Sequence, residues 1–171
     1  MNSFLLEKVG KTYNEGCCML YLNVSLDELH DKINKKDLTE DGIEDEPHVT
    51  LLYGFKENVD IDDIKKAIDG IEFGEIKLLK VSLFENDEHD VLKYDVSGDG
   101  LKEAFAKLNK IPNDNKYDDY KPHITLGYIK SGKGQKYVDI FNGIKFTAKP
   151  MFVVYSPGGD NDKIIIGIKK K

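Results

Sequence analysis

The sequence contains no arginine and no tryptophan, and its only cysteines are the adjacent pair Cys17 and Cys18. All 25 cationic side chains are lysine, so bidentate recognition of an anion by a guanidinium group is excluded. Neighbouring cysteines rarely bond each other, and these two are flanked by apolar residues. We therefore expect buried free thiols in a reducing cytoplasm.

Long apolar runs are also missing. No run approaches the roughly 20 residues that span a bilayer, and the first residues lack the basic segment and long apolar core of a signal peptide. A length of 171 residues with 40% hydrophobic and 33% charged residues is typical of one soluble globular domain. We expect a single monomeric domain over residues 1–171, located in the cytoplasm and without membrane contact.

Charge is distributed unevenly along the chain. Residues 1–86 hold 10 lysines and 19 acidic residues, which gives −9, whereas residues 87–171 hold 15 lysines and 12 acidic residues, which gives +3. The net charge of −6 argues against duplex nucleic acid as a partner, because duplex binding depends on many phosphate contacts. A small anionic ligand held mainly by the C-terminal half remains compatible with this distribution.

One short motif occurs twice. Residues 47–53 read PHVTLLY and residues 122–128 read PHITLGY, so both copies follow Pro-His-x-Thr-Leu-x-Tyr. Each copy is typical of a β-strand, in which side chains alternate between two faces. Alternation predicts that the histidine and threonine of each copy share one face. It also puts Tyr53 and Tyr128 on the core face, unless a bulge re-aims them, and it puts Leu52 and Gly127 in phase with the histidines.

The elements around the two motifs occur in the same order. We expect strands over residues 16–24, 47–54, 72–84, 91–96, 121–130, 144–155 and 163–169, helices over 26–33, 60–68, 101–109 and 134–141, and polar loops over 37–46 and 112–119. Ser25 and Glu28 predict a capped start for the first helix. From the end of the lead strand to the motif histidine is 23 residues in one half and 26 in the other, which indicates a duplication. The sequence predicts an α+β fold with antiparallel sheets in two pseudo-symmetric lobes, about 16–86 and 91–171, around a central cleft.

Two histidines with a pKa near neutrality can act as a general acid and a general base in displacement at phosphorus. His48 and His123 are the candidates, and the hydroxyls of Thr50 and Thr125 can donate hydrogen bonds to the charged phosphate oxygens. The other two histidines, in a predicted helix and a predicted turn, have no partner at ligand spacing. We therefore expect neither a metal site nor a cofactor.

The two His-x-Thr motifs resemble those of the 2H phosphoesterase superfamily, which has the LigT-like fold. The sequence around them, residues 44–50 and 120–125, is similar to that of bacteriophage-associated members. The resemblance implies a bilobal fold whose cleft is lined by the two histidines and two threonines. It also implies metal-independent cleavage of cyclic nucleotides, 2′–5′ linkages or 2′,3′-cyclic phosphates. Some phage members degrade the cyclic oligonucleotide signals of bacterial antiviral immunity, so such a signal is one candidate substrate, acted on in the host cytoplasm.

Further residues are candidates for binding substrate, each with a structural alternative. Lys121 lies in phase with His123 and can meet a phosphate, or it is an exposed strand lysine. Tyr120 and Phe55 flank the motifs and can stack on a base or pack in the core. Lys133 belongs to a lysine-rich loop that attracts a phosphate or is only solvated. The remaining candidates are the two motif tyrosines, for which alternation favours packing.

Two other motifs are incomplete. Residues 127–133 match the first seven positions of a P-loop, but Gly134 replaces the Ser or Thr that binds magnesium. Residues 37–42 begin like a calcium loop whose twelfth position is His48 instead of Glu. The main functional alternatives to a phosphodiesterase are a protein that sequesters a nucleotide without cleaving it and a structural phage component.

Overall fold

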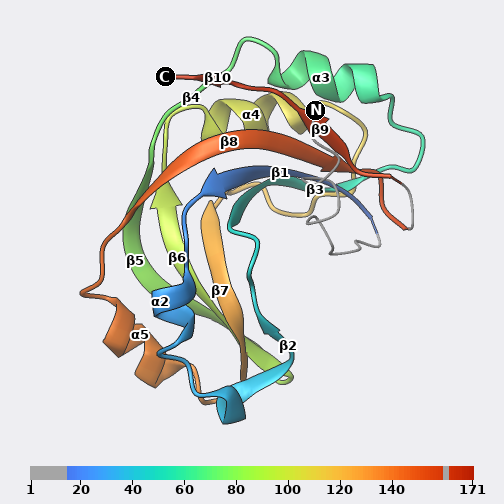
Figure 1. Cartoon of the computed structure of the whole chain (residues 1–171). Helices are drawn as coiled ribbons and strands as arrows, with labels where there is room; N and C mark the ends of the chain where they lie inside the picture. Colours follow the sequence, from blue (N-terminus) through green and yellow to red (C-terminus); the bar gives the residue numbers. More distant parts are fainter. Residues whose placement is uncertain (1–14, 160–161) are drawn as a thin grey trace.

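The computed structural model describes residues 15–159 and 162–171 (Figure 1). The predicted α+β class is confirmed: within the described residues, eight strands form one antiparallel sheet and two short strands form a parallel pair. The strands are β1 (Gly16–Asn23), β2 (Leu38–Ile43), β3 (His48–Phe55), β4 (Glu72–Phe73), β5 (Ile76–Glu85), β6 (His89–Ser97), β7 (His123–Lys130), β8 (Thr147–Ser156), β9 (Ile164–Ile166) and β10 (Lys169–Lys170). The helices are α2 (Asp27–His30), η1 (Lys35–Asp37), α3 (Ile61–Ile68), α4 (Leu101–Leu108) and α5 (Gln135–Phe141). Among the described residues, no helix has the length and apolar character needed to span a bilayer.

The large sheet is bent between two four-stranded parts: β9, β8, β1 and β3 form one, and β5, β6, β7 and β2 form the other. Strands β8, β1 and β3 run across the view in Figure 1, and β5, β6 and β7 run down it. The two parts meet at two short junctions. Strands β3 and β7 are joined by the single pair Val49–Ile124, and β5 and β8 are joined by two pairs near their ends. The first junction lies directly beside both motif histidines.

Strand pairing crosses the boundary expected between the two halves of the chain. Strand β5, from the first half, pairs along its length with β6 of the second half. Strand β8, from the second half, pairs along its length with β1 of the first half. Each part of the sheet therefore contains strands from both halves of the chain, in contrast to the consecutive lobes 16–86 and 91–171 of the sequence prediction. The hydrophobic pattern of a strand specifies its buried face and does not specify its neighbour.

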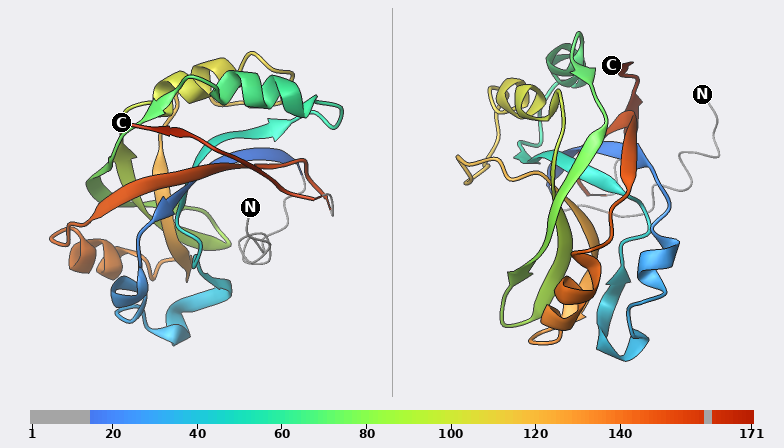
Figure 2. Two further views of the ribbon diagram at one scale, coloured as in Figure 1. Left: turned by 45° about the horizontal axis from the view of Figure 1, so that its top comes forward. Right: turned by 90° about the vertical axis from the view of Figure 1, so that its left-hand side faces the viewer.

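Helices α3 and α4 lie side by side over one end of the bent sheet, and α2 and α5 lie together at the other end (Figure 2). Asp60 caps α3, because its side chain accepts a hydrogen bond from the Asp62 amide at 2.9 Å. All four helices contribute to one core with the inward faces of the strands. The adjacent thiols of Cys17 and Cys18 are free and buried, as predicted, and burial raises the pKa of both.

Four local predictions were wrong in detail. The first helix lasts one turn, because Asn34 starts a separate 3-10 turn, although Ser25 Oγ does accept from the Asp27 amide at 3.4 Å. The strand expected over 72–84 is interrupted at residues 74–75, and the closing strand is split into β9 and β10. The acidic loop expected over 37–46 contains β2, which pairs with β7. Strand β3 uses only the start of that edge of β7, so the remaining backbone groups are available to β2.

Each motif strand contains a β-bulge at the leucine that follows the threonine. The register between β1 and β3 skips Leu51, and the register between β6 and β7 skips Leu126. The extra residue shifts the alternation by one. Opposite residues in an antiparallel pair share a face, so Tyr53 lies on the face of Thr50, and Tyr128 lies on the face of Thr125.

The core packing expected for the two tyrosines is therefore wrong. Tyr53 is 42% exposed, whereas Leu52, expected beside His48, is buried at 2%. Gly127 also lies on the buried side, where a Cβ would come within 3.2 Å of the Gly42 carbonyl oxygen on β2. Two hydrogen bonds from residues outside β6 stabilise the bulge in β7. The Leu126 carbonyl accepts one from the Glu44 amide and one from His30 Nε2, both at 3.0 Å.

A matched pair of substitutions tests the first bulge. Leu51→Ala removes a fully buried side chain and is expected to lower the free energy of unfolding by about 2–5 kcal/mol. Tyr53→Ala removes an exposed side chain and is expected to cost less than about 1 kcal/mol. Urea unfolding measures both values. A cost for Tyr53→Ala equal to that for Leu51→Ala would show that the tyrosine packs in the core and that the bulge is absent.

Candidate active site

His48 and His123 meet at the junction of β3 and β7. Val49 lies opposite Ile124 in an antiparallel pair, so the next positions along the strands place His48 across from Thr125 and Thr50 across from His123. Val49 and Ile124 point into the core and are fully buried, whereas the four motif side chains lie on the other face and are half-buried. The four predicted catalytic residues are thus brought to one place on one face.

Both imidazole rings are held in the same way. His48 Nδ1 lies 2.7 Å from the Glu46 carbonyl oxygen, and His123 Nδ1 lies 3.0 Å from the Lys121 carbonyl oxygen. A carbonyl only accepts hydrogen bonds, so Nδ1 carries the proton in both neutral rings. Nε2 is consequently the atom of each ring that can accept a proton from a substrate or return one.

The prolines shared by the two motifs have a structural role. The Pro47 carbonyl accepts from the Leu22 amide on β1 at 2.9 Å, and the Pro122 carbonyl accepts from the Val96 amide on β6 at 3.1 Å. Proline has no N–H that would require a partner, and it restricts the residue before it to extended conformations. The carbonyl of that preceding residue is thereby directed back to the histidine. The x-Pro-His sequence therefore orients the histidine ring through a local hydrogen bond.

The two histidines have different neighbours. On β1, Tyr21 lies opposite His48 and stacks on its ring, with centroids 5.5 Å apart and planes at 23°. The Tyr21 hydroxyl donates to a Glu46 carboxylate oxygen at 3.2 Å. On β6, Asp95 lies opposite His123, and the ring of Phe84 meets the His123 ring edge-on with centroids 5.2 Å apart. The first histidine has an aromatic neighbour across the strand and the second has a charged one.

The pKa of His123 is lowered below its ordinary value near 6.5. The largest cause is burial, which disfavours the charged imidazolium, and the bond to the Lys121 carbonyl opposes it. The positive charges of Lys93 and of protonated His48 lower this pKa further, and the Asp95 carboxylate raises it. The effect of His48 shows that the two rings are close enough to interact electrostatically. The environment of His123 therefore favours the neutral ring over the imidazolium, relative to an exposed histidine.

Two of the predicted substrate-binding residues lie on the site face, and one lies beside it. Tyr53 and Tyr128 follow the threonines on this face because of the bulges, and Tyr128 also meets His89 edge-on. Lys121 contributes its backbone carbonyl to His123. Its side chain is 74% exposed and pairs with Asp119 at 3.6 Å.

The other three predicted binding residues lie elsewhere. Tyr120 stacks on Phe105 with centroids 4.6 Å apart, and its hydroxyl donates to the Thr50 carbonyl at 3.0 Å, so it packs against the core and braces the first motif strand. Phe55 is buried at the far end of β3 against Tyr155. Lys133 follows the far end of β7, about 20 Å along the strand from His123, and its charge acts on Asp37.

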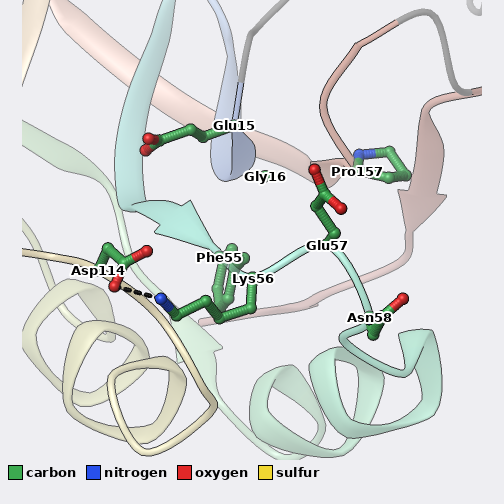
Figure 3. Close-up of a pocket in the computed structure, with 8 residues that line it drawn as sticks. All are labelled: Glu15, Gly16, Phe55, Lys56, Glu57, Asn58, Asp114 and Pro157. Carbon is green, nitrogen blue, oxygen red and sulfur yellow. Dashed lines mark hydrogen bonds and ion pairs between the residues drawn. The ribbon is translucent and has the colours of Figure 1, made fainter.

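A hollow of about 420 Å³ lies at the end of β3 and is separate from the histidines (Figure 3). It is lined by Glu15, Gly16, Phe55, Lys56, Glu57, Asn58, Asp114 and Pro157. Its one lysine is paired with Asp114 at 2.5 Å, so most of the remaining charge is acidic. This charge is unfavourable for a phosphate ligand, and the hollow is not a second part of the histidine site.

Sequence reasoning missed the second layer of the site, which includes Tyr21, Phe84, Lys93 and Asp95. Lys93 and Asp95 alternate with apolar residues in β6, a pattern typical of a strand with one polar face. This pattern does not reveal that β6 lies beside β7. Within residues 15–159 and 162–171, no group of three or more His, Cys, Asp or Glu side chains is arranged to hold a metal ion.

Comparisons with known proteins place these features in a family. The model of the family described as Anti-CBASS protein Acb1 matches residues 17–149, which is well over half of the chain and includes both motifs. A solved structure described as the MHV ns2 PDE domain is similar with a TM-score of 0.51 and 16% sequence identity. The match covers 92% of this chain and 99% of that one, so the two share a fold. No curated protein matches the sequence. The predicted 2H phosphoesterase resemblance is confirmed by these findings, and the chain belongs to the family of Anti-CBASS protein Acb1.

Proposed function

We propose that the protein is a metal-independent phosphodiesterase that cleaves a cyclic oligonucleotide signal of bacterial antiviral immunity. The family supports the substrate class. The observation that carries the proposal is the matched pair of rings beside the Val49–Ile124 junction, each with Nδ1 bonded to a backbone carbonyl and Nε2 available for proton transfer. In this proposal the protein acts as a monomer in the cytoplasm of an infected host.

The chemistry needs two proton transfers at one phosphorus atom. With a 3′–5′ linkage, one Nε2 takes the proton of the substrate's 2′-hydroxyl while the oxygen attacks phosphorus. The other ring, as imidazolium, gives its proton to the departing 5′-oxygen. The products are a 2′,3′-cyclic phosphate and a 5′-hydroxyl. With a 2′,3′-cyclic phosphate as substrate, water takes the place of the 2′-hydroxyl.

The threonines are assigned to the phosphate. Each lies across from the histidine of the other motif, so one phosphate between the rings is within reach of both hydroxyls, which stabilise charge on its non-bridging oxygens. We further propose that the two parts of the bent sheet form two lobes related by a pseudo-two-fold axis through this junction. The matching x-Pro-His bonds and the matching bulges support the relation.

The direct test is incubation with a panel of 3′–5′-linked cyclic dinucleotides and trinucleotides, followed by chromatography of the products. We expect linear products from the wild-type protein and a loss of at least about 1,000-fold in rate for His48→Ala and for His123→Ala, because each removes one proton transfer. The variants should retain the wild-type melting temperature. Intact ligand recovered after denaturation of a bound complex would instead identify a sequestering protein, and absence of binding to any nucleotide would indicate a structural role.

The pH dependence follows from the lowered pKa of His123. Two coupled imidazoles give a bell-shaped kcat/KM profile, and its limbs report the pair as a unit. Because burial and neighbouring cations hold the pKa of His123 down, the acidic limb is expected below pH 6.5 and activity is lost as pH falls through it. The profile is expected to be unchanged by EDTA. Loss of turnover in EDTA, restored by a divalent metal, would contradict the mechanism.

The motif tyrosines are proposed to stack on the bases that flank the cleaved phosphate. Tyr53→Ala and Tyr128→Ala are each expected to raise KM about 5- to 100-fold with a smaller effect on kcat, since one base stack contributes about 1–3 kcal/mol. Tyr117→Ala is the matched control, because that tyrosine is 77% exposed in the loop before β7 and belongs to neither motif strand. Unchanged KM in both motif variants would remove the tyrosines from the binding site.

A further inference from the structure

Lys93 is a buried lysine on the site face of the sheet. It lies on β6 directly across from Thr125, and only 5% of the residue is exposed. Burial of an ammonium group is unfavourable unless the charge is paired and hydrogen-bonded. The proposed proton transfers do not use this residue. Its presence two positions from the strand partner of His123 therefore requires an explanation.

The ammonium group is fixed by a closed set of contacts. Lys93 Nζ donates to Ser82 Oγ at 2.6 Å and to Asp95 Oδ1 at 2.5 Å, and Ser82 Oγ donates to the same Asp95 oxygen at 3.0 Å. Nζ also lies 4.1 Å from the centroid of the Phe84 ring. Phe84 meets the ring of His123 edge-on, so the ammonium and the imidazole contact the same aromatic side chain.

The strand beside the first motif carries no charged side chain at the corresponding positions. The strand positions across from Thr50 and His48 are occupied by Met19 and Tyr21, whereas the positions across from Thr125 and His123 are occupied by Lys93 and Asp95. Two motifs of the same sequence therefore lie beside differently charged strands. This difference is a physical means of giving the two histidines different protonation states.

We propose that Lys93, anchored by Ser82 and Asp95, is a positioning residue that holds His123 in its neutral form, which makes His123 the general base and His48 the general acid. The inference rests on the proposed phosphodiesterase function. A cation beside an imidazole opposes its protonation, and a buried, triply contacted ammonium does so without screening by water. The ammonium does not take part in proton transfer and acts only through the ring beside it.

The charged groups that face His123 are few. From β6 they are Lys93 and Asp95, which act in opposite directions, and from β3 the group is His48. On β5, Ser82 and Phe84 are uncharged, and Lys80, which lies across from Asp95 on the same face, is exposed to solvent. Lys93 lowers the pKa of His123 and Asp95 raises it; the side chain of Lys93 is 6% exposed and that of Asp95 is 26% exposed, so water screens the lysine charge less than the carboxylate charge.

The test is an NMR titration of the histidine ring signals in the substrate-free protein. In Lys93→Met the midpoint for His123 is expected to rise by about half to one pH unit, because the opposing charge is removed. In Lys93→Met/Asp95→Asn it should rise less, because the opposite effect of the carboxylate is removed as well. Lys56→Gln is the control: it breaks another Lys–Asp pair of 2.5 Å, beyond the far end of β3, and should leave the midpoint unchanged.

Activity separates the two proposals. If the wild-type protein cleaves a cyclic dinucleotide, the acidic limb of its kcat/KM profile should move upward in Lys93→Met together with the His123 midpoint. An unmoved or lowered midpoint, or an unmoved limb in an active enzyme, overturns the role of Lys93. If no cyclic dinucleotide or trinucleotide is cleaved, the proposed function and the base assignment both fail, whereas a moved midpoint still demonstrates the coupling. If Lys93→Met does not fold, Asp95→Asn tests the same electrostatic coupling. The Asp95 side chain is 26% exposed, and loss of its carboxylate is expected to lower the His123 midpoint.

Discussion

The single backbone pair between Val49 and Ile124 is the constraint on which the rest of the site depends. Because the strands are antiparallel at this point, each histidine lies across from the threonine of the other motif. Because the pairing is so short, β7 diverges from β3 and completes its edge with β2. The junction thus brings the two motifs, which are distant in the sequence, together on one face of the sheet. The other face of both strands packs in the core.

Within each strand, two local devices direct the side chains. The x-Pro-His segment ties the ring to its own backbone and leaves Nε2 for chemistry. The bulge after the threonine shifts the alternation, so that the leucines remain in the core while the tyrosine returns to the face of the histidine. Both devices occur in both motifs. The repeat is therefore a repeat of geometry as well as of sequence.

Neighbouring strands then make the two copies different. Tyr21 stacks on His48, while Lys93, Asp95 and Phe84 surround His123. A general acid and a general base need different protonation states at the same pH. Identical motifs cannot provide such a difference by themselves; in this protein the surroundings of the two rings differ because different residues pack beside them.

Much of the architecture was predictable from local patterns. Strands β1, β3, β6 and β7 and helices α3 and α4 begin and end within a few residues of the predicted bounds. Their hydrophobic periods and, for α3, its cap act over short stretches of chain. The predictions failed where a partner decides the outcome. The acidic segment 38–43 becomes a strand because an edge of β7 is available to it, and β5 and β8 pair outside the half of the chain from which they come.

By itself the sequence determined which residues are candidates for the site: two histidines and two threonines on strands with one buried face, an inference that needs only the alternation of side chains. The tertiary structure alone decided how they are arranged. It brought the two strands together, re-aimed the tyrosines through bulges that are defined by the neighbouring ladders, and excluded Phe55, Lys133 and Tyr120 from the face of the histidines. The physical reason is the distance along the chain over which each effect acts. Alternation and capping depend on neighbours in the chain, whereas register, burial and the electrostatic environment of His123 depend on which strands lie side by side.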